Sequence, residues 1–207
     1  QDGPSLAAVD SFDAWIYGDG AHGAYPHTGS DPLYMLAPIL TAIYAIPSRR
    51  INPLYPSVVS VGQVSGGATT NVIPNEVLLK GTMRSMSTEV REQLWSELEN
   101  ALRMSELMGG RYKLNITKGY PPMVNNQEAN NWMRQVTTDL MGQDAVVESQ
   151  FGMGAEDFAY MTQKAKGAMF MLGAAMPEGP ARHHHTAIFD IDENILVPGA
   201  AVLAETA

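Results

Sequence analysis

The sequence predicts an α+β fold built on a four-stranded antiparallel sheet with two helices on one face. Between residues 11 and 118 the expected elements run strand, helix, strand, strand, helix, strand, which is the order of a ferredoxin-like unit. After Pro121 and Pro122, helices alternate with short strand candidates, as in a layered α/β domain. We therefore divide the chain into a first domain, residues 11–118, and a partial second domain, residues 119–207 together with 1–10. The second domain has so few strands that we expect the rest of its sheet to lie outside this chain.

The first strand and the first helix follow from turn and capping signals. Residues 12–17 have strand character, and the turn from Gly18 to Gly20 ends them. Asp31 followed by Pro32 combines a capping residue with an early proline, so a helix begins there. An apolar run extends this helix to residue 46, and we place Pro47 in the loop that follows.

The other elements of the first domain are a strand pair, a second helix and a fourth strand. β-Branched residues predict strands at 57–64 and 76–84, joined by a turn at 65–74 that is rich in glycine and hydroxyl groups. Apolar residues at helical spacing predict a helix at 89–108, which Gly109 ends. Alternation of side-chain type predicts the last strand at 111–117.

The second domain is expected to contain three helices and two short strands. The helices are predicted at 127–141, near 156–163 and after residue 192, and the strands at 146–147 and 168–172.

Composition excludes some classes of function. The net charge is −9 and the 13 lysines and arginines are scattered, which argues against a nucleic-acid partner. No apolar run is long enough to cross a bilayer, so we expect no membrane partner. The absence of cysteine excludes disulfides and thiolate zinc sites. The chain begins with Gln1 rather than methionine and stops within a helical pattern, so we expect it to be part of a longer one. Its location stays open, with the cytoplasm favoured.

The five histidines form two clusters that resemble parts of a metal site. His22 and His27 share one loop, and His183, His184 and His185 stand together before an acidic segment. A catalytic metal needs about three protein ligands that converge in space. Three adjacent histidines cannot all face one ion, so at most one or two of the triplet should bind; the alternative is a solvated histidine run.

Three further groups are weaker candidates when they are considered alone. His22 could donate a hydrogen bond to a developing oxyanion, although a turn histidine bonded to its own backbone is the simpler interpretation. Asn71 and Arg84 offer donors that suit a carboxylate, at the ends of strands that a hairpin would bring together. Glu156 and Asp157 open a helix after two glycines, which capping alone explains.

Five segments in one order resemble the dinuclear-zinc peptidase and aminoacylase superfamily, in the amidohydrolase branch that includes hippurate hydrolase and indole-acetyl-amino-acid hydrolase. The matching segments are residues 20–27 with Asp31-Pro32, residues 66–74, residues 81–84, residues 154–158 and residues 185–193. Each motif is weak, but five in family order are specific, and together they cover nearly the whole chain. Two departures, Ala21 in place of glycine and Thr186-Ala187 in place of Ser-Pro, do not break the resemblance.

The resemblance implies a two-domain enzyme in which a ferredoxin-like lid, here residues 11–118, interrupts a zinc-peptidase-like catalytic α/β domain and mediates homodimerisation. It implies that His185 ligates a zinc ion. It also implies that His22 reaches into the partner's site to steady the tetrahedral intermediate. Asn71 and Arg84 match positions that hold the substrate, and we expect His27 to contact substrate as well.

The implied chemistry is hydrolysis of the amide of N-acyl amino acids or small peptides by two zinc ions, with manganese, cobalt or nickel as alternatives. The general base and most metal ligands of this branch belong to a segment that this chain does not contain. We therefore expect the 207 residues alone to be inactive and to bind zinc weakly. A dimerisation or binding module without chemistry is the alternative, and a free-standing metal sensor based on the histidine triplet is the third hypothesis.

Overall fold

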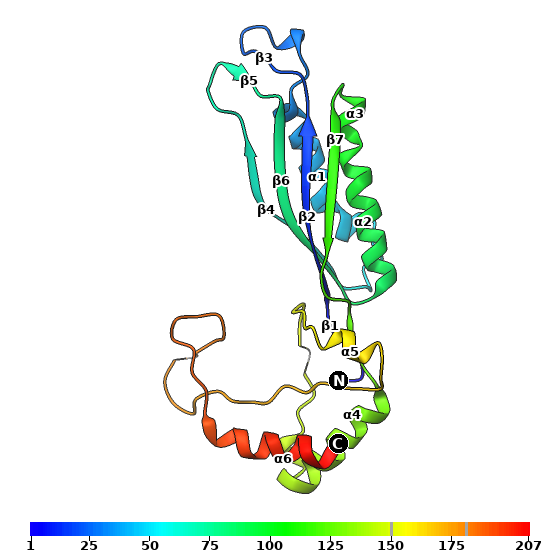
Figure 1. Ribbon diagram of the computed structural model, residues 1–207, viewed down its shortest axis with the longest axis vertical. Coiled ribbons are helices and arrows are strands. Elements are labelled where there is room, and N and C mark those ends of the chain that lie inside the picture. The colour runs from blue at the N-terminus through cyan, green and yellow to red at the C-terminus, as the bar shows by residue number, and fades with distance from the viewer. Residues whose placement is uncertain (150, 181) are drawn as a thin grey trace. The chain divides into compact units, whose positions relative to one another are not determined.

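The computed structural model describes residues 1–149, 151–180 and 182–207, and these divide into two compact units (Figure 1). The sheet unit comprises residues 4–123 and 151–160, and the helical unit comprises residues 1–3, 124–150 and 161–207. The predicted domain limits at 11 and 118 lie inside the sheet unit and stay a prediction. No helix of the described residues is both long enough and apolar enough to cross a membrane.

The sheet unit has the ferredoxin-like architecture that the sequence predicts. Its strands stand in the order β4-β6-β2-β7, and each neighbouring pair is antiparallel. Helices α1 and α2 pack on the sheet, and their apolar residues share one core with the buried residues of β2, β4 and β6. The elements are β2 (Ala8–Tyr17), α1 (Pro32–Arg49), β4 (Ser57–Gly66), β6 (Glu76–Ser85), α2 (Thr88–Leu102), α3 (Met104–Leu107) and β7 (Arg111–Lys118).

The first helix continues past the residue at which the sequence predicts its end. Asp31 caps α1 as predicted, because its carboxylate accepts the Leu33 N–H at 2.8 Å. Pro47 lies inside the helix rather than in a loop. Proline forfeits only its own N–H bond, and the next turn closes because Arg50 N–H donates to the Ile46 carbonyl at 2.9 Å.

The second predicted helix is divided in two. It runs as α2 to Leu102 and resumes as α3 from Met104 to Leu107. Gly109 then has φ +82°, the left-handed conformation that ends helices.

Two small sheets complete the strand pairing. β3 (Ala21–His22) pairs with β5 (Val72–Ile73). β1 (Gly3–Leu6) and β8 (Met123–Asn125) form the other two-stranded sheet.

In the helical unit, α4 (Gln127–Met141) packs against α6 (Leu196–Thr206). The short 3-10 helices η2 (Gln143–Ala145) and η3 (Glu193–Ile195) flank them, and Asp192 caps η3 through the Asn194 N–H. The helices predicted at 127–141 and after residue 192 are thereby confirmed.

The strands predicted at 146–147 and 168–172 are wrong. Neither segment has strand structure, because neither pairs with a neighbouring strand through backbone hydrogen bonds. At Met169 the Asn125 side chain makes the two backbone hydrogen bonds that a neighbouring strand would make. The Asn125 amide accepts the Met169 N–H at 2.8 Å and donates to the Met169 carbonyl at 2.9 Å.

We call the end of the sheet unit that contains Asp10, Arg84 and Gly119 the base. A buried ion pair there connects β2, α2 and the residue that follows β7. Asp10 is 2% exposed and accepts hydrogen bonds from Arg91 on α2 at 2.5 and 2.9 Å, from Trp95 Nε1 at 2.7 Å and from the Gly119 N–H at 3.0 Å. Burial alone would raise the pKa of Asp10. The hydrogen bonds from Arg91, Trp95 and Gly119 outweigh it and hold that pKa below its ordinary value.

Asp10→Asn should lower the free energy of unfolding by about 3–5 kcal/mol, because it leaves the Arg91 charge buried without its carboxylate. The matched control is Asp13→Asn on the same strand. Asp13 lies 3.4 Å from Lys80 with both side chains about half exposed, and such surface pairs contribute less than about 1 kcal/mol. Urea titration of both variants measures the difference, and equal losses would contradict a structural role for the buried pair.

Low pH should remove the stabilisation that the ion pair between Asp10 and Arg91 contributes. Because the folded-state pKa of Asp10 is lowered, its stabilisation is complete above the unfolded value of about 3.9 and is lost as pH falls through the folded value. Wild-type stability should therefore fall more steeply below about pH 4 than that of Asp10→Asn. Unfolding curves at a series of acidic pH values test this, and parallel curves would refute it.

Candidate functional site

The two histidines of the first cluster lie in a loop that close backbone contacts hold in place. The Asp19 N–H donates to the Ser30 carbonyl at 3.0 Å, and the Gly20 N–H donates to the Asn75 side chain at 2.7 Å. At Gly29 a Cβ would stand 2.3 Å from the Asp19 carbonyl oxygen, so only glycine fits without a backbone shift. The loop therefore has a defined shape although its side chains are exposed.

Strand pairing brings His22 and Asn71 into one place, at the end of the sheet unit that we call the lid tip (residues 18–29 and 67–75). Strands β3 and β5 lie beside each other at this end (Figure 1). His22 stands opposite Val72 in this pair, and the Gly23 N–H donates to the Asn71 carbonyl at 2.8 Å. His22 also has the local bond of a turn histidine, since its Nδ1 accepts the Ala24 N–H at 3.1 Å.

His27 reaches the same tip through an aromatic contact. It lies in the 3-10 helix η1 (Pro26–Thr28) and is exposed. The Tyr25 ring is tilted against His22 with centroids 5.6 Å apart, and it meets His27 edge-on at 6.4 Å. Tyr25 thus stands between the two histidines.

Arg84 lies at the opposite end of its strand from Asn71, so the expected hairpin does not bring the two together. Arg84 pairs with Val9 and Val58 near the base, whereas Asn71 precedes the tip end of β6. Eight residues of extended chain between Glu76 and Arg84 span about 25 Å. The Arg84 guanidinium is half-buried, and its Nη1 donates to the Met153 carbonyl at 2.9 Å.

The glycine-rich segment around Met153 is anchored to the base. The Ala7 N–H donates to the Gly154 carbonyl at 2.8 Å. Glu156 accepts the Asp157 N–H at 3.0 Å just before the short helix α5 (Ala159–Thr162), which begins later than predicted. The Glu156 side chain thus bonds its chain neighbour outside α5, whose first turn contains no acidic residue, so these contacts do not show the capping that the sequence suggested.

His185 has a backbone conformation that sets it apart. Its φ is +62°, the one left-handed residue other than glycine among the described residues, and such a conformation costs about 1–2 kcal/mol. Its ring meets that of His184 at 4.9 Å, and both are exposed. Within residues 1–149, 151–180 and 182–207, no group of three or more histidine, aspartate or glutamate side chains could hold a metal ion. His185 can therefore be one ligand of a site, and this chain's described residues do not complete it.

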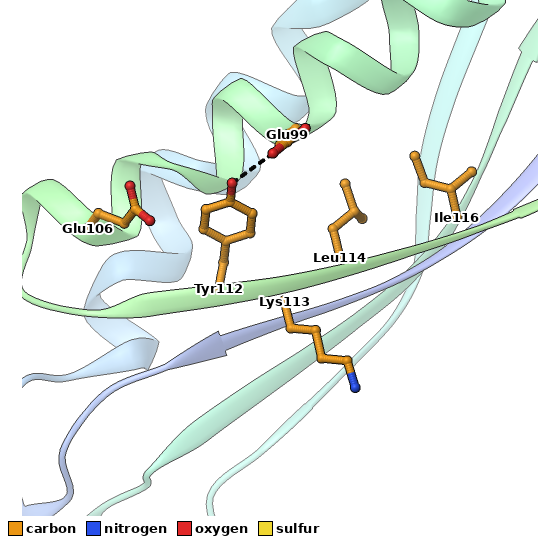
Figure 2. A pocket seen from close by; sticks show the side chains of 6 residues that line it. All are labelled: Glu99, Glu106, Tyr112, Lys113, Leu114 and Ile116. Carbon is orange, nitrogen blue, oxygen red and sulfur yellow. Dashed lines mark hydrogen bonds between the residues drawn. The ribbon is translucent and has the colours of Figure 1, made fainter.

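A shallow pocket of about 550 Å³ lies where β7 meets α2 and α3, and the sequence did not single it out (Figure 2). Tyr112 donates to Glu99 at 2.9 Å, and Glu99 also pairs with Arg103 one turn later. Burial and the Glu99 contact raise the pKa of Tyr112, while Arg103 and then Tyr112 lower the pKa of Glu99. The pocket residues are Glu99, Glu106, Tyr112, Lys113, Leu114 and Ile116. The i,i+4 spacing of Glu99 and Arg103 was the one sequence signal for this arrangement.

Comparison with known proteins places this fold in a class. Residues 7–106 match the family model described as the peptidase dimerisation domain. This range contains α1, α2 and three strands of the four-stranded sheet together with the lid tip. The sheet unit is therefore built on a peptidase dimerisation domain.

Three proteins of Bacillus subtilis extend the likeness to the whole chain. The candidate amidohydrolase YhaA is 36% identical over 99% of this chain and 52% of its own length. N-acetyl-L-cysteine deacetylase is 33% identical over 99% of this chain and 48% of its own. The solved structure of a dinuclear metal-binding peptidase from the M20 family is 23% identical with a TM-score of 0.80, covering all of this chain and 51% of its own. The chain belongs to the amidohydrolase branch of this peptidase superfamily, and it spans about half the length of the curated relatives that it matches.

Gly29→Ala should distort the loop that carries His22, because the new methyl group meets the Asp19 carbonyl. We expect a loss of about 1–3 kcal/mol in stability and shifted imidazole NMR signals of His22 and His27. Gly62→Ala is the control, since nothing lies within 4 Å of its Cβ position. Unchanged histidine signals in Gly29→Ala would show that the close contact does not shape the loop.

Proposed function

We propose that this chain provides the lid and part of the catalytic domain of a metal-dependent amidohydrolase that cleaves the amide of N-acyl amino acids or small peptides. Its family membership and its likeness to N-acetyl-L-cysteine deacetylase support this substrate class. The single observation that carries the proposal is the lid tip, where β3–β5 pairing places His22 and Asn71 side by side on a peptidase dimerisation domain.

The metal site would need further ligands besides His185, and the described residues do not bring such ligands together. An imidazole such as that of His185 is a good ligand for zinc, and manganese, cobalt or nickel are alternatives. The bound metal supplies an activated water and polarises the scissile carbonyl. His185 would hold one ion, and its left-handed backbone is a conformation typical of functional positions. Among the described residues no group of three ligands could hold a metal ion, and on this basis we propose that the 207 residues alone are inactive and bind zinc weakly.

The other proposed residues would bind and orient the substrate. His22 would donate a hydrogen bond to the oxyanion of the tetrahedral intermediate. The planar fork of Arg84 matches a carboxylate, with Asn71 and His27 as further substrate contacts.

The geometry of β6 supports a site shared between two chains. His22 and Asn71 are at one end of this strand and Arg84 is about 25 Å away at the other, so one chain cannot bring all three to a small substrate. Two chains can do so if each tip reaches the other's base. We therefore propose a homodimer formed through the lid, consistent with the dimerisation domain that residues 7–106 match.

The side of the lid formed by α1 and the edge strand β4 is suited to this contact. β4 has a neighbour on one side only, so a second copy could extend the sheet there. At Val61 the edge is already occupied, because the Tyr44 hydroxyl bonds both its N–H and its carbonyl at 3.2 and 3.3 Å. Added pairing would therefore fall on the parts of β4 before or after Val61. Exposed apolar residues on α1, β4 and β5 are Leu33, Tyr34, Tyr44, Val64 and Val72.

A non-catalytic dimerisation or binding module is the second candidate, and the incomplete ligand set favours it for the 207 residues taken alone. The two candidates differ in one assay. The polypeptide that the whole coding sequence specifies should hydrolyse N-acetyl or N-benzoyl amino acids, and a chelator should abolish the reaction. Residues 1–207 alone should show no chelator-sensitive hydrolysis. An inactive complete polypeptide, tested with each of the four metals, would leave the binding module as the better account.

Subunit mixing tests the shared site directly. His22→Ala should lower kcat by about 10²–10³-fold, the usual effect of losing an oxyanion donor, whereas His184→Ala should change kcat little. Arg84→Ala should also be nearly inactive. When the His22→Ala and Arg84→Ala chains are mixed and exchanged, half the dimers are mixed and each has one intact site. About a quarter of wild-type activity should then return. No recovery after confirmed exchange would rule out sharing of these residues between subunits.

A further inference from the structure

At the lid tip, His22 Nδ1 and Asn71 Oδ1 each accept a hydrogen bond from a close chain neighbour. The Ala24 N–H donates to His22 Nδ1 at 3.1 Å, and the Thr69 hydroxyl donates to Asn71 Oδ1 at 3.3 Å. Ala24 and Thr69 lie in segments that carry the family resemblance, but the sequence alone assigns neither of them a role. Both bonds are short-range, within two residues along the chain, so the loop and the turn each carry their own orienting group.

These two bonds determine what each side chain can offer to a ligand. A neutral imidazole has one acceptor and one donor nitrogen, so an Nδ1 that accepts requires the proton on Nε2. In the neutral ring this bond therefore selects the Nε2–H tautomer. An amide whose oxygen accepts from Thr69 leaves its NH₂ group to point outward.

We propose that the Ala24 N–H and the Thr69 hydroxyl are positioning groups that turn two donors, the Nε2–H of His22 and the NH₂ group of Asn71, to an acceptor-rich group of the substrate. This inference rests on the proposed function for the identity of the ligand, an oxyanion or carboxylate oxygen. It assigns His22 the role of a hydrogen-bond donor through Nε2. It also makes Thr69 a determinant of substrate binding that acts through Asn71.

The imidazole part can be tested on residues 1–207 without any catalytic assay. Long-range ¹H–¹⁵N spectra of histidine-labelled protein at about pH 8.5, where an ordinary imidazole is neutral, distinguish the two tautomers. His22 should be in the Nε2–H form. Ala24→Pro removes the N–H donor and should raise the Nδ1–H population, whereas Ala24→Ser keeps the donor and should not. An Nδ1–H tautomer in the wild-type protein would overturn the proposal, whatever the protein hydrolyses.

The Thr69 part is tested by kinetics on the complete polypeptide with N-acetyl amino acids. Thr69→Val removes the hydroxyl and should raise KM by about three- to tenfold with little change in kcat, because Asn71 can then rotate its oxygen outward. Thr69→Ser keeps the hydroxyl and should restore KM. The matched control is the neighbouring Thr70→Val, since Thr70 makes no such bond among the described residues. Equal KM values for Thr69→Val and Thr70→Val would overturn the role of Thr69, and the wild-type rate in the same assay reports separately on the proposed function.

Discussion

The ten-residue antiparallel register between β2 and β6 determines where every candidate group of the lid lies. β6 is hydrogen-bonded on both sides, to β2 and to β4, so it cannot shift without breaking two ladders. This register places the turn that carries Asn71 beside the loop that carries His22, and it places Arg84 opposite Val9 at the other end. The separation of tip and base, and hence the case for a site shared between subunits, follows from this one constraint.

The base depends on a second interaction that the strand register makes possible. Asp10 is on the buried face of β2, where it meets Arg91 and Trp95 of α2 and the backbone of Gly119. Asp10 lies near the start of β2 and Gly119 follows the end of β7, so one carboxylate connects both strands to α2. Lys118 and Arg91 also lie against the Trp95 ring, at 4.1 and 5.3 Å from its centroid. The ion pair is thereby shielded from water on the side of the indole.

The sequence predicted the order of the elements in the lid and two helices of the other unit, but it missed some element ends and both predicted short strands, for physical reasons. In the lid, periodicity, capping by Asp31 and the stop at Gly109 each act locally, and local signals are visible in a sequence. Residues 168–172 have the composition of a strand but no neighbouring strand. The Asn125 side chain bonds the backbone of Met169 instead, and no sequence pattern predicts such a contact. The histidines and Asn71 were found as chemical candidates. The large distance between Arg84 and Asn71 was not predicted, because it depends on which end of β6 each residue occupies.

Tyr44 has a consequence for the behaviour of a lone subunit. A sheet edge with free N–H and carbonyl groups is a template on which strands of other molecules can add, and natural proteins usually obstruct such edges. The Tyr44 hydroxyl covers the Val61 groups midway along β4, and the strand bulges next to them between Val61 and Gln63. An uninterrupted edge on an unpaired subunit would invite fibrous aggregation. One phenol and one bulge interrupt that edge midway along the strand.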